Sequence, residues 1–235
     1  MLPYHNMYVE VFGGGGSLLF TKRPSFTEVY NDINNDLWNF FYQLKEAPEA
    51  LRKEIDSTPV ARRIFEEKPR TDLERAVWFF LRKKASVLAK GKDFDCFEKD
   101  IKTVKNLDVD YFSSRLRYVA IENRDFEYIF KRYDKATTLF YCDPPYHFKG
   151  VGKLYGEYDW EDDDIHERLY ESIAKTHGKF ILSYNDCEYV RNRYKDYHIK
   201  KHEISCTHIN TNDRDDRTSN ETKSKYLEEL IIWNF

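Results

Sequence analysis

Four residues in the second half of the chain combine types that could do chemistry on a planar amine. They are Asp143, Pro144, Pro145 and Tyr146. Proline fixes φ and lacks an N–H, so Asp143 and the carbonyl of Pro144 are presented as acceptors without a neighbouring donor. Two acceptors beside an aromatic ring suit a flat substrate that carries an amino group. We therefore interpret this acid–proline turn as the candidate reactive centre.

A run of glycines near the amino terminus is the second candidate site. Residues 13–16 follow the apolar segment Tyr8–Phe12 and precede Ser17–Phe20, which begins a helix. A strand, a glycine turn and a helix open many nucleotide-binding α/β folds, because glycine lets a ligand approach the backbone closely. A mobile surface loop is the alternative, although so many glycines make an entropically costly connector. The dinucleotide pattern GxGxxG and the Walker lysine are both missing, which leaves a ligand without phosphates.

Two further acids are expected at the ends of other strands. Asp32 follows the strand-like segment Phe26–Tyr30, at a spacing typical of an acid that receives ribose hydroxyls. It also suits the N-cap of the helix Asn35–Leu44, and the two roles are compatible. Asp125 and Phe126 come between a strand and a helix, on the same edge. An N-cap aspartate beside a core phenylalanine is an equally good interpretation of that pair.

These side chains need a scaffold that gathers them at one edge. Apolar runs typical of strands recur at 8–12, 26–30, 121–126, 137–142, 179–184, 198–206 and 226–235. Helical patterns lie between most of these runs. The alternation predicts an α/β fold with a mostly parallel sheet. The last run is expected to close the sheet as an antiparallel strand, paired with the preceding strand across a long polar loop.

The alternation breaks off between residues 45 and 117. Periodic helical segments such as Asp72–Leu88 take its place, so we predict a main domain of residues 1–44 and 118–235 with a helical insertion of residues 45–117. The insertion holds more Lys and Arg than Asp and Glu. Its basic residues without intervening acids are Arg82, Lys83, Lys84, Lys90 and Lys92. They could neutralise nucleic-acid phosphates, or form a solvated helix end followed by a polar turn.

Composition bounds the class of protein. With 235 residues, of which 41% are hydrophobic, the chain can bury a substantial core. The formal charge of -3 argues against a uniformly basic nucleic-acid binder but allows a local basic face. No apolar stretch reaches the roughly 18 residues of a membrane-spanning helix, and no signal peptide opens the chain. Four cysteines without a CxxC pair indicate reduced thiols in a cytoplasmic protein, and the histidine spacing predicts no metal site.

Taken in order, the motifs resemble those of the Dam-type (D12 class) adenine-N6 DNA methyltransferases. The similar stretches are residues 9–16, 31–34, 143–146, 182–185 and 228–235. The resemblance implies a Rossmann-like S-adenosylmethionine-dependent methyltransferase fold, with target recognition in the insertion. It also implies methyl transfer from S-adenosylmethionine to the N6 amino group of an adenine flipped out of double-stranded DNA. Whether a restriction endonuclease acts beside the chain is left open.

The resemblance also assigns roles to individual residues. The residues implied to line the cofactor are Glu10, Phe12, Gly14 and Gly16. Asp32 would hold the cofactor's ribose hydroxyls, and Asp125 with Phe126 would flank its adenine. Asp143 would lie between the cofactor and the target base, and Tyr146 would stack on that base. The two prolines of the turn complete the catalytic motif.

Two positions depart from the family pattern. Relatives usually carry a Lys-x-x-Gly-Lys-like motif upstream of the first strand, and none precedes Tyr8 here. Val11 occupies the place of a common proline. A second hypothesis is therefore a methyltransferase-like DNA-binding protein with weakened or lost turnover. Adenine methylation of RNA is a further alternative, but the ordered set of motifs favours DNA.

Overall fold

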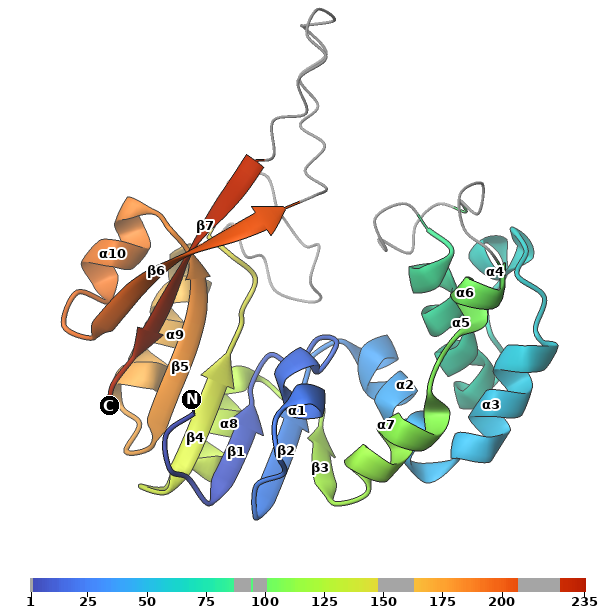
Figure 1. Ribbon diagram of the computed structural model, residues 1–235, viewed down its shortest axis with the longest axis horizontal. Helices are drawn as coiled ribbons and strands as arrows, with labels where there is room; N and C mark the ends of the chain where they lie inside the picture. The colour runs from blue at the N-terminus through green and yellow to red at the C-terminus, as the bar shows by residue number, and fades with distance from the viewer. Residues whose placement is uncertain (1, 87–93, 95–100, 148–162, 207–224) are drawn as a thin grey trace, which may run out of the picture.

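A seven-stranded sheet forms the centre of the computed structural model, which describes residues 2–86, 94, 101–147, 163–206 and 225–235 (Figure 1). The strands are β1 Met7–Glu10, β2 Thr27–Asn31, β3 Val119–Glu122, β4 Thr138–Cys142, β5 Lys179–Asn185, β6 His198–Cys206 and β7 Lys225–Trp233. Their spatial order is β3-β2-β1-β4-β5-β7-β6. The first five strands in this order are parallel to one another, and β7 runs antiparallel between β5 and β6. This confirms the predicted mostly parallel sheet with an antiparallel terminal strand.

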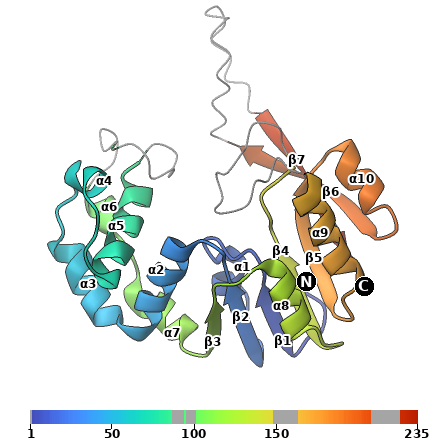
Figure 2. The ribbon, with the colours of Figure 1, turned by 180° about the vertical axis from the view of Figure 1, so that it is seen from behind.

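Helices cover both faces of the sheet, as Figures 1 and 2 show from opposite sides. The helices of the described residues are α1 Ser17–Thr21, α2 Asn35–Glu46, α3 Pro48–Ser57, α4 Arg63–Glu66, α5 Asp72–Lys84, α6 Ile101–Lys105, α7 Val109–Leu116, α8 Phe126–Tyr133, α9 Asp163–Ala174 and α10 Glu188–Arg193. Tyr8 joins one hydrophobic cluster with Leu19 of α1, whereas the next residue, Val9, joins a second cluster with Ile129 of α8 and Leu169 of α9. Successive strand residues point to opposite faces, so a strand covered on both sides is apolar throughout.

The helices α3 to α7 form the insertion, which lies beyond the β3 edge of the sheet (Figure 1). The longest of them, α5, packs on α2, where the rings of Phe40 and Phe80 stack with centroids 5.6 Å apart. One hydrophobic cluster therefore runs from the strands through α2 into the insertion. The predicted helix Asp72–Leu88 ends at Lys84, and residues 87–93 lie outside the described part of the chain.

A buried ion cluster ties the insertion to the sheet. Glu28 of β2 is 4% exposed and pairs with Lys22 after α1 and Arg115 of α7. The Arg115 guanidinium also donates to the carbonyl of Leu19, 2.8 Å away. Burial would raise the pKa of Glu28, but the hydrogen bonds from Arg115 and Lys22 lower the pKa overall. The acid therefore stays ionised and holds α7 against β2.

Several element boundaries differ from the sequence-based expectation. β1 ends at Glu10, before the predicted end at Phe12, because the chain turns directly into the glycine loop. β3 ends at Glu122 because Asp125 already caps the helix that follows. β2 begins after Phe26, whose side chain is 95% exposed. None of the described helices is long and apolar enough to cross a membrane.

Candidate functional site

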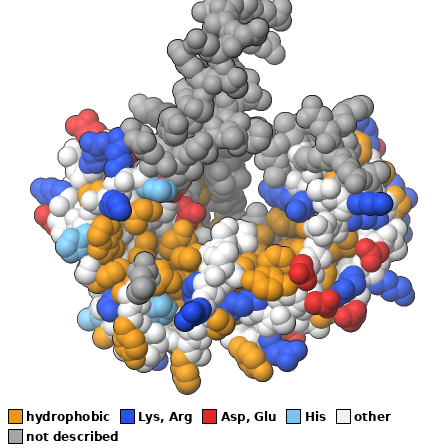
Figure 3. All heavy atoms as spheres, viewed as in Figure 1, with side chains coloured by type: hydrophobic (Ala, Val, Ile, Leu, Met, Phe, Trp, Pro, Cys, Tyr) orange, Lys and Arg blue, Asp and Glu red, His pale blue; other side chains and the backbone are white. Residues whose placement is uncertain are grey.

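A cavity of about 800 Å³ opens at the carboxyl ends of β1, β2 and β4. The first and fourth strands are neighbours although their connections lead to different sides of the sheet, and ligands of open α/β sheets bind at such switch points. The glycine loop, the residues after β2 and the acid–proline turn all contribute to its lining. Figure 3 shows this face hollowed between the strand side and the insertion side, with hydrophobic side chains on both. The volume falls in the usual range for small-molecule sites.

The glycine loop is held tightly against β2. Gly14 has a φ of 48°, its N–H donates to Asp32 Oδ2 at 2.9 Å, and its carbonyl accepts the Tyr30 hydroxyl at 2.7 Å. A Cβ on Gly13 would lie 2.2 Å from the Tyr30 ring, so this close approach requires glycine. Gly14 lines the cavity. Gly16, with a φ of 69°, instead stands at the N-cap of α1 and is not among the described lining residues.

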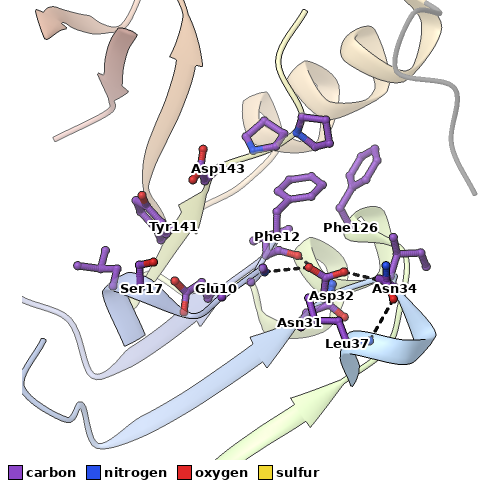
Figure 4. Close-up of a pocket in the computed structure, with 18 of the residues that line it drawn as sticks. Glu10, Phe12, Ser17, Asn31, Asp32, Asn34, Leu37, Phe126, Tyr141 and Asp143 are labelled. Carbon is purple, nitrogen blue, oxygen red and sulfur yellow. Dashed lines mark hydrogen bonds between the residues drawn. The ribbon is translucent and has the colours of Figure 1, made fainter. Parts of the chain in front are cut away.

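Asp32 lines the cavity at the end of β2, but it does not cap the following helix. The cap of α2 is Asn34, whose side chain accepts from the backbone N–H groups of Asp36 and Leu37. The two Asp32 oxygens accept from the N–H groups of Gly14 and Asn34, at 2.9 and 2.8 Å (Figure 4). Burial raises the pKa of Asp32, and these two hydrogen bonds oppose the shift. The N-cap interpretation is wrong, and the carboxylate ties the glycine loop to the start of α2.

Asn31, just before this acid, joins three strand ends. Its side-chain amide donates to the carbonyls of Val11 and Arg124, at 2.9 and 3.0 Å, and its oxygen accepts from the Arg124 N–H. The side chain is 2% exposed and lines the cavity. The first polar residue of the 31–34 motif is therefore structural, and it brings Arg124 into the cavity wall.

Glu10 is the most deeply buried acid of the cavity. It is the last residue of β1, is 2% exposed, and faces the cavity beside Ser17 (Figure 4). Burial raises its pKa to about 8, the charge of Asp143 adds to the shift, and the Leu19 amide and Lys22 oppose it. Within the described residues, Oε2 has no hydrogen-bond partner. Buried carboxylate oxygens are normally paired, so an unpaired one in a cavity wall indicates a site for a cationic or hydrogen-bond-donating ligand.

The acid–proline turn closes the cavity at the end of β4. All four of its residues, from Asp143 to Tyr146, line the cavity. The Asp143 carboxyl is open to the cavity, yet desolvation by the surrounding walls raises its pKa to about 6. The charge of Glu229 adds to this shift and a hydrogen bond from Ser183 opposes it. Burial also raises the pKa of the preceding thiol, Cys142, far above neutrality, so this cysteine is a core residue and not a nucleophile.

Asp125 and Phe126 have different positions: the acid caps a helix, and the ring lines the cavity. Asp125 caps α8 by accepting from the Glu127 N–H at 2.7 Å, and it is not among the described lining residues. Its carboxylate lies 3.6 Å from the guanidinium of Arg168. Phe126 is 2% exposed, lines the cavity, and has its ring 5.6 Å from that of Phe12. The capping interpretation holds for Asp125, and the cavity contains the two phenylalanines.

Of the basic residues predicted to contact nucleic acid, the three that the structure describes differ in their surroundings. The Arg82 guanidinium donates to the carbonyls of Ile64 and Glu67, the latter at 2.9 Å, which ties α5 to the end of α4. Lys83 lines the cavity, and Lys84 is exposed at the helix end. Lys90 and Lys92 lie outside the described residues.

A glycine loop, a buried acid and an acid–proline turn at the switch point of a mostly parallel sheet define a Rossmann-like methyltransferase. Residues 1–85 and 91–206 match the family described as D12 class N6 adenine-specific DNA methyltransferase, and the chain belongs to that family. It is therefore an adenine-specific DNA methyltransferase, as the order of its motifs predicts. The type II methyltransferase M1.LlaDCHI of Lactococcus lactis subsp. cremoris is 27% identical over 233 residues, which cover 88% of this chain and 81% of that relative.

Proposed function

We propose that this chain transfers a methyl group from S-adenosylmethionine to N6 of an adenine that has been flipped out of double-stranded DNA. The observation that carries the proposal is the cavity, where Glu10, Asp32 and Asp143 stand on three neighbouring strand ends. The unpaired Oε2 of Glu10 suits the cationic methionine end of this donor. The two oxygens of Asp32 suit ribose hydroxyls, and the ring of Phe126 suits an adenine face.

The acid–proline turn would act on the amine of the target base. The lone pair of that nitrogen is delocalised into the ring, so it is a poor nucleophile. Asp143 and the Pro144 carbonyl would accept hydrogen bonds from its two N–H groups and favour the pyramidal geometry in which the lone pair is available. S-adenosylmethionine, when bound, supplies a methyl group activated by its sulfonium. The N–C bond would form as the S–C bond breaks, the thioether S-adenosylhomocysteine would leave, and the proton lost by the nitrogen would pass to water. Alignment contributes much of the rate.

Flipping follows from the position of the turn. A base stacked in a duplex cannot reach a carboxylate inside a cavity, so the target has to leave the helix. Tyr146 lines the cavity one step beyond the prolines and would stack on the extruded base. Lys83, which lines the cavity, and Lys84, which is exposed beside it at the end of α5, remain the described candidates for phosphate contacts.

Two measurements on the wild-type chain test this function. Labelled methyl from S-adenosylmethionine is expected to appear at N6 of adenine in duplex DNA, and calorimetry is expected to show binding of the donor. Single-stranded RNA of matched sequence serves as the control substrate. DNA binding without donor affinity would favour the alternative of a methyltransferase-like DNA-binding protein, and preferential methylation of RNA would change the substrate.

Donor binding is expected to release a proton from Glu10. Because the pKa of Glu10 is raised to about 8, this carboxyl is largely protonated at pH 7 in the free protein. A bound cation lowers that pKa, so most of a proton should pass to the buffer at pH 7 and little at pH 9, where Glu10 is already ionised. Calorimetry in buffers of different ionisation enthalpy measures the release. The donor's own amine can release protons in both proteins, so the difference in proton release between wild type and Glu10→Gln isolates the contribution of Glu10. Equal release by the two proteins would remove Glu10 from the cation site.

A further inference from the structure

A second carboxylate lies behind the acid–proline turn, on the antiparallel strand β7. Glu229 is 8% exposed and stands opposite Asn185 of β5 in the sheet. Its Oε1 accepts hydrogen bonds from the hydroxyls of Tyr146 and Ser183. These two hydroxyl oxygens are themselves 3.3 Å apart. A residue far along the chain thus holds the last residue of the turn and the strand beside it.

We propose that Glu229 is a positioning residue for methyl transfer, which orients the Tyr146 ring through its hydroxyl and holds the turn against Ser183 of β5. This inference rests on the proposed function, because it concerns how the same turn receives the target base. Glu229 itself is not among the described residues that line the cavity, so it acts through its neighbours.

The orientation of Tyr146 is fixed at both ends of the side chain. Its hydroxyl donates to Glu229, and its ring lies at 25° to that of Tyr184, with centroids 6.1 Å apart. The hydroxyl of Tyr184 is in turn hydrogen-bonded to His166 of α9. Burial and the hydrogen bond to Glu229 raise the pKa of Tyr146 above its usual range, so the phenol remains a donor at working pH. A ring held in this way can stack on a base without first losing rotational freedom.

The charge of Glu229 reaches Asp143 from across the sheet. Desolvation is the largest cause of the raised pKa of Asp143, and Glu229 is the next. Among the described residues, the titratable groups that face Asp143 or interact with it are Glu10 of β1, Tyr141 and Cys142 of β4, Tyr146 of the turn and Glu229 of β7. Ser183 of β5 opposes the shift by hydrogen bonding. A more basic carboxylate is a stronger acceptor for an amine N–H, so a second negative charge strengthens the contact that Asp143 is proposed to make.

The antiparallel strand is what makes this arrangement available. β7 enters the sheet between β5 and β6, and its register brings Ser183 opposite Ile231 and Asn185 opposite Glu229. The Glu229 side chain therefore reaches Ser183 and Tyr146 from the neighbouring strand. An ordinary surface position on an edge strand would leave this carboxylate in water, where its effect on Asp143 would be screened.

The test is a titration of Asp143 in the absence of donor and DNA. Carboxyl-carbon NMR of aspartate-labelled protein, with Asp143→Asn for assignment, gives the pKa directly. In Glu229→Gln, which keeps the size and the acceptor oxygen, that pKa is expected to fall from about 6 toward the ordinary aspartate value. The acid limb of the rate profile should move to lower pH with it, and the rate at pH 8 should fall by about tenfold.

Matched variants separate positioning from stability. Glu28→Gln removes another buried acid, 4% exposed, and is expected to leave both the Asp143 titration and the acid limb in place. Tyr146→Phe keeps the ring and loses the hydroxyl. The double variant Tyr146→Phe/Glu229→Ala should lose no more rate than Glu229→Ala loses alone. If Glu229→Gln fails to fold, Ser183→Ala and Tyr146→Phe report on the same contacts. If the pKa of Asp143 is the same in Glu229→Gln as in wild type, and the rate losses of Tyr146→Phe and Glu229→Ala are additive, the inference is overturned. If the wild-type protein transfers no methyl group, the proposed function is overturned instead.

Discussion

Asp143→Asn and Asp143→Ala are expected to lower kcat for adenine methylation by about a thousandfold or more, with little change in the Kd for DNA. The carboxylate is a charged acceptor in the wall of the cavity, directly after β4, and the prolines that follow provide no competing N–H donor. Asparagine preserves the shape but replaces one acceptor oxygen by a donor. Alanine removes the contact altogether, so the two variants should differ in degree and agree in direction.

The pH dependence of the wild-type rate provides the companion measurement. Asp143 is a charged acceptor, with both oxygens free of a proton, only when it is ionised, and its pKa is raised to about 6. The rate should therefore be full above that pH and be lost as the pH falls through it. Asp196→Asn is the matched control, since this exposed acid lies in the turn before β6. Wild-type kcat in Asp143→Asn would exclude the proposed role of the turn.

Local patterns carried enough information to predict the strand ends of this site. Each candidate near Gly14, Asp32 and Asp143 follows an apolar run, and parallel strands bring their carboxyl ends to one edge. The missing GxGxxG and Walker patterns then predicted a ligand without phosphates. The same reasoning gave the mostly parallel sheet, because alternation of strand and helix is a property of the chain itself.

Contacts between distant segments could not be predicted in the same way. Phe79 and Lys83 line the cavity because α5 packs on α2, and nothing local distinguishes them from other residues of an amphipathic helix. Glu229 lies in the run Leu227–Trp233, where an acid in a strand looks like an ordinary solvent-facing residue. Its burial depends on β7 entering between β5 and β6, which is a property of the assembled sheet. The available signal was the pair of adjacent acids, Glu228 and Glu229, within an otherwise apolar terminal run, of which strand alternation turns one to each face.

Asp32→Asn is expected to weaken S-adenosylmethionine binding by about 100-fold, which corresponds to about 3 kcal/mol. Hydrogen bonds to a charged group contribute about 1.5–3 kcal/mol each, and two ribose hydroxyls are proposed to bind here. The variant also disturbs the free protein, because both Asp32 oxygens accept from backbone N–H groups, those of Gly14 and Asn34. An amide at this position would place an NH₂ group against one of those donors and loosen the glycine loop.

The expected signature of Asp32→Asn is therefore a raised Kd for the donor with a smaller loss of kcat at saturating donor. Thr71→Ala is the matched control, because Thr71 does not line the cavity. The variant removes the N-cap of α5, a hydroxyl oxygen that accepts from the Glu74 N–H at 3.1 Å. It should cost about 1 kcal/mol of stability and leave donor affinity unchanged. Calorimetry and thermal unfolding of both variants separate the two effects. Donor binding by Asp32→Asn with the wild-type Kd would mean that the ribose is held elsewhere, and the acid would then serve only to join the glycine loop to α2.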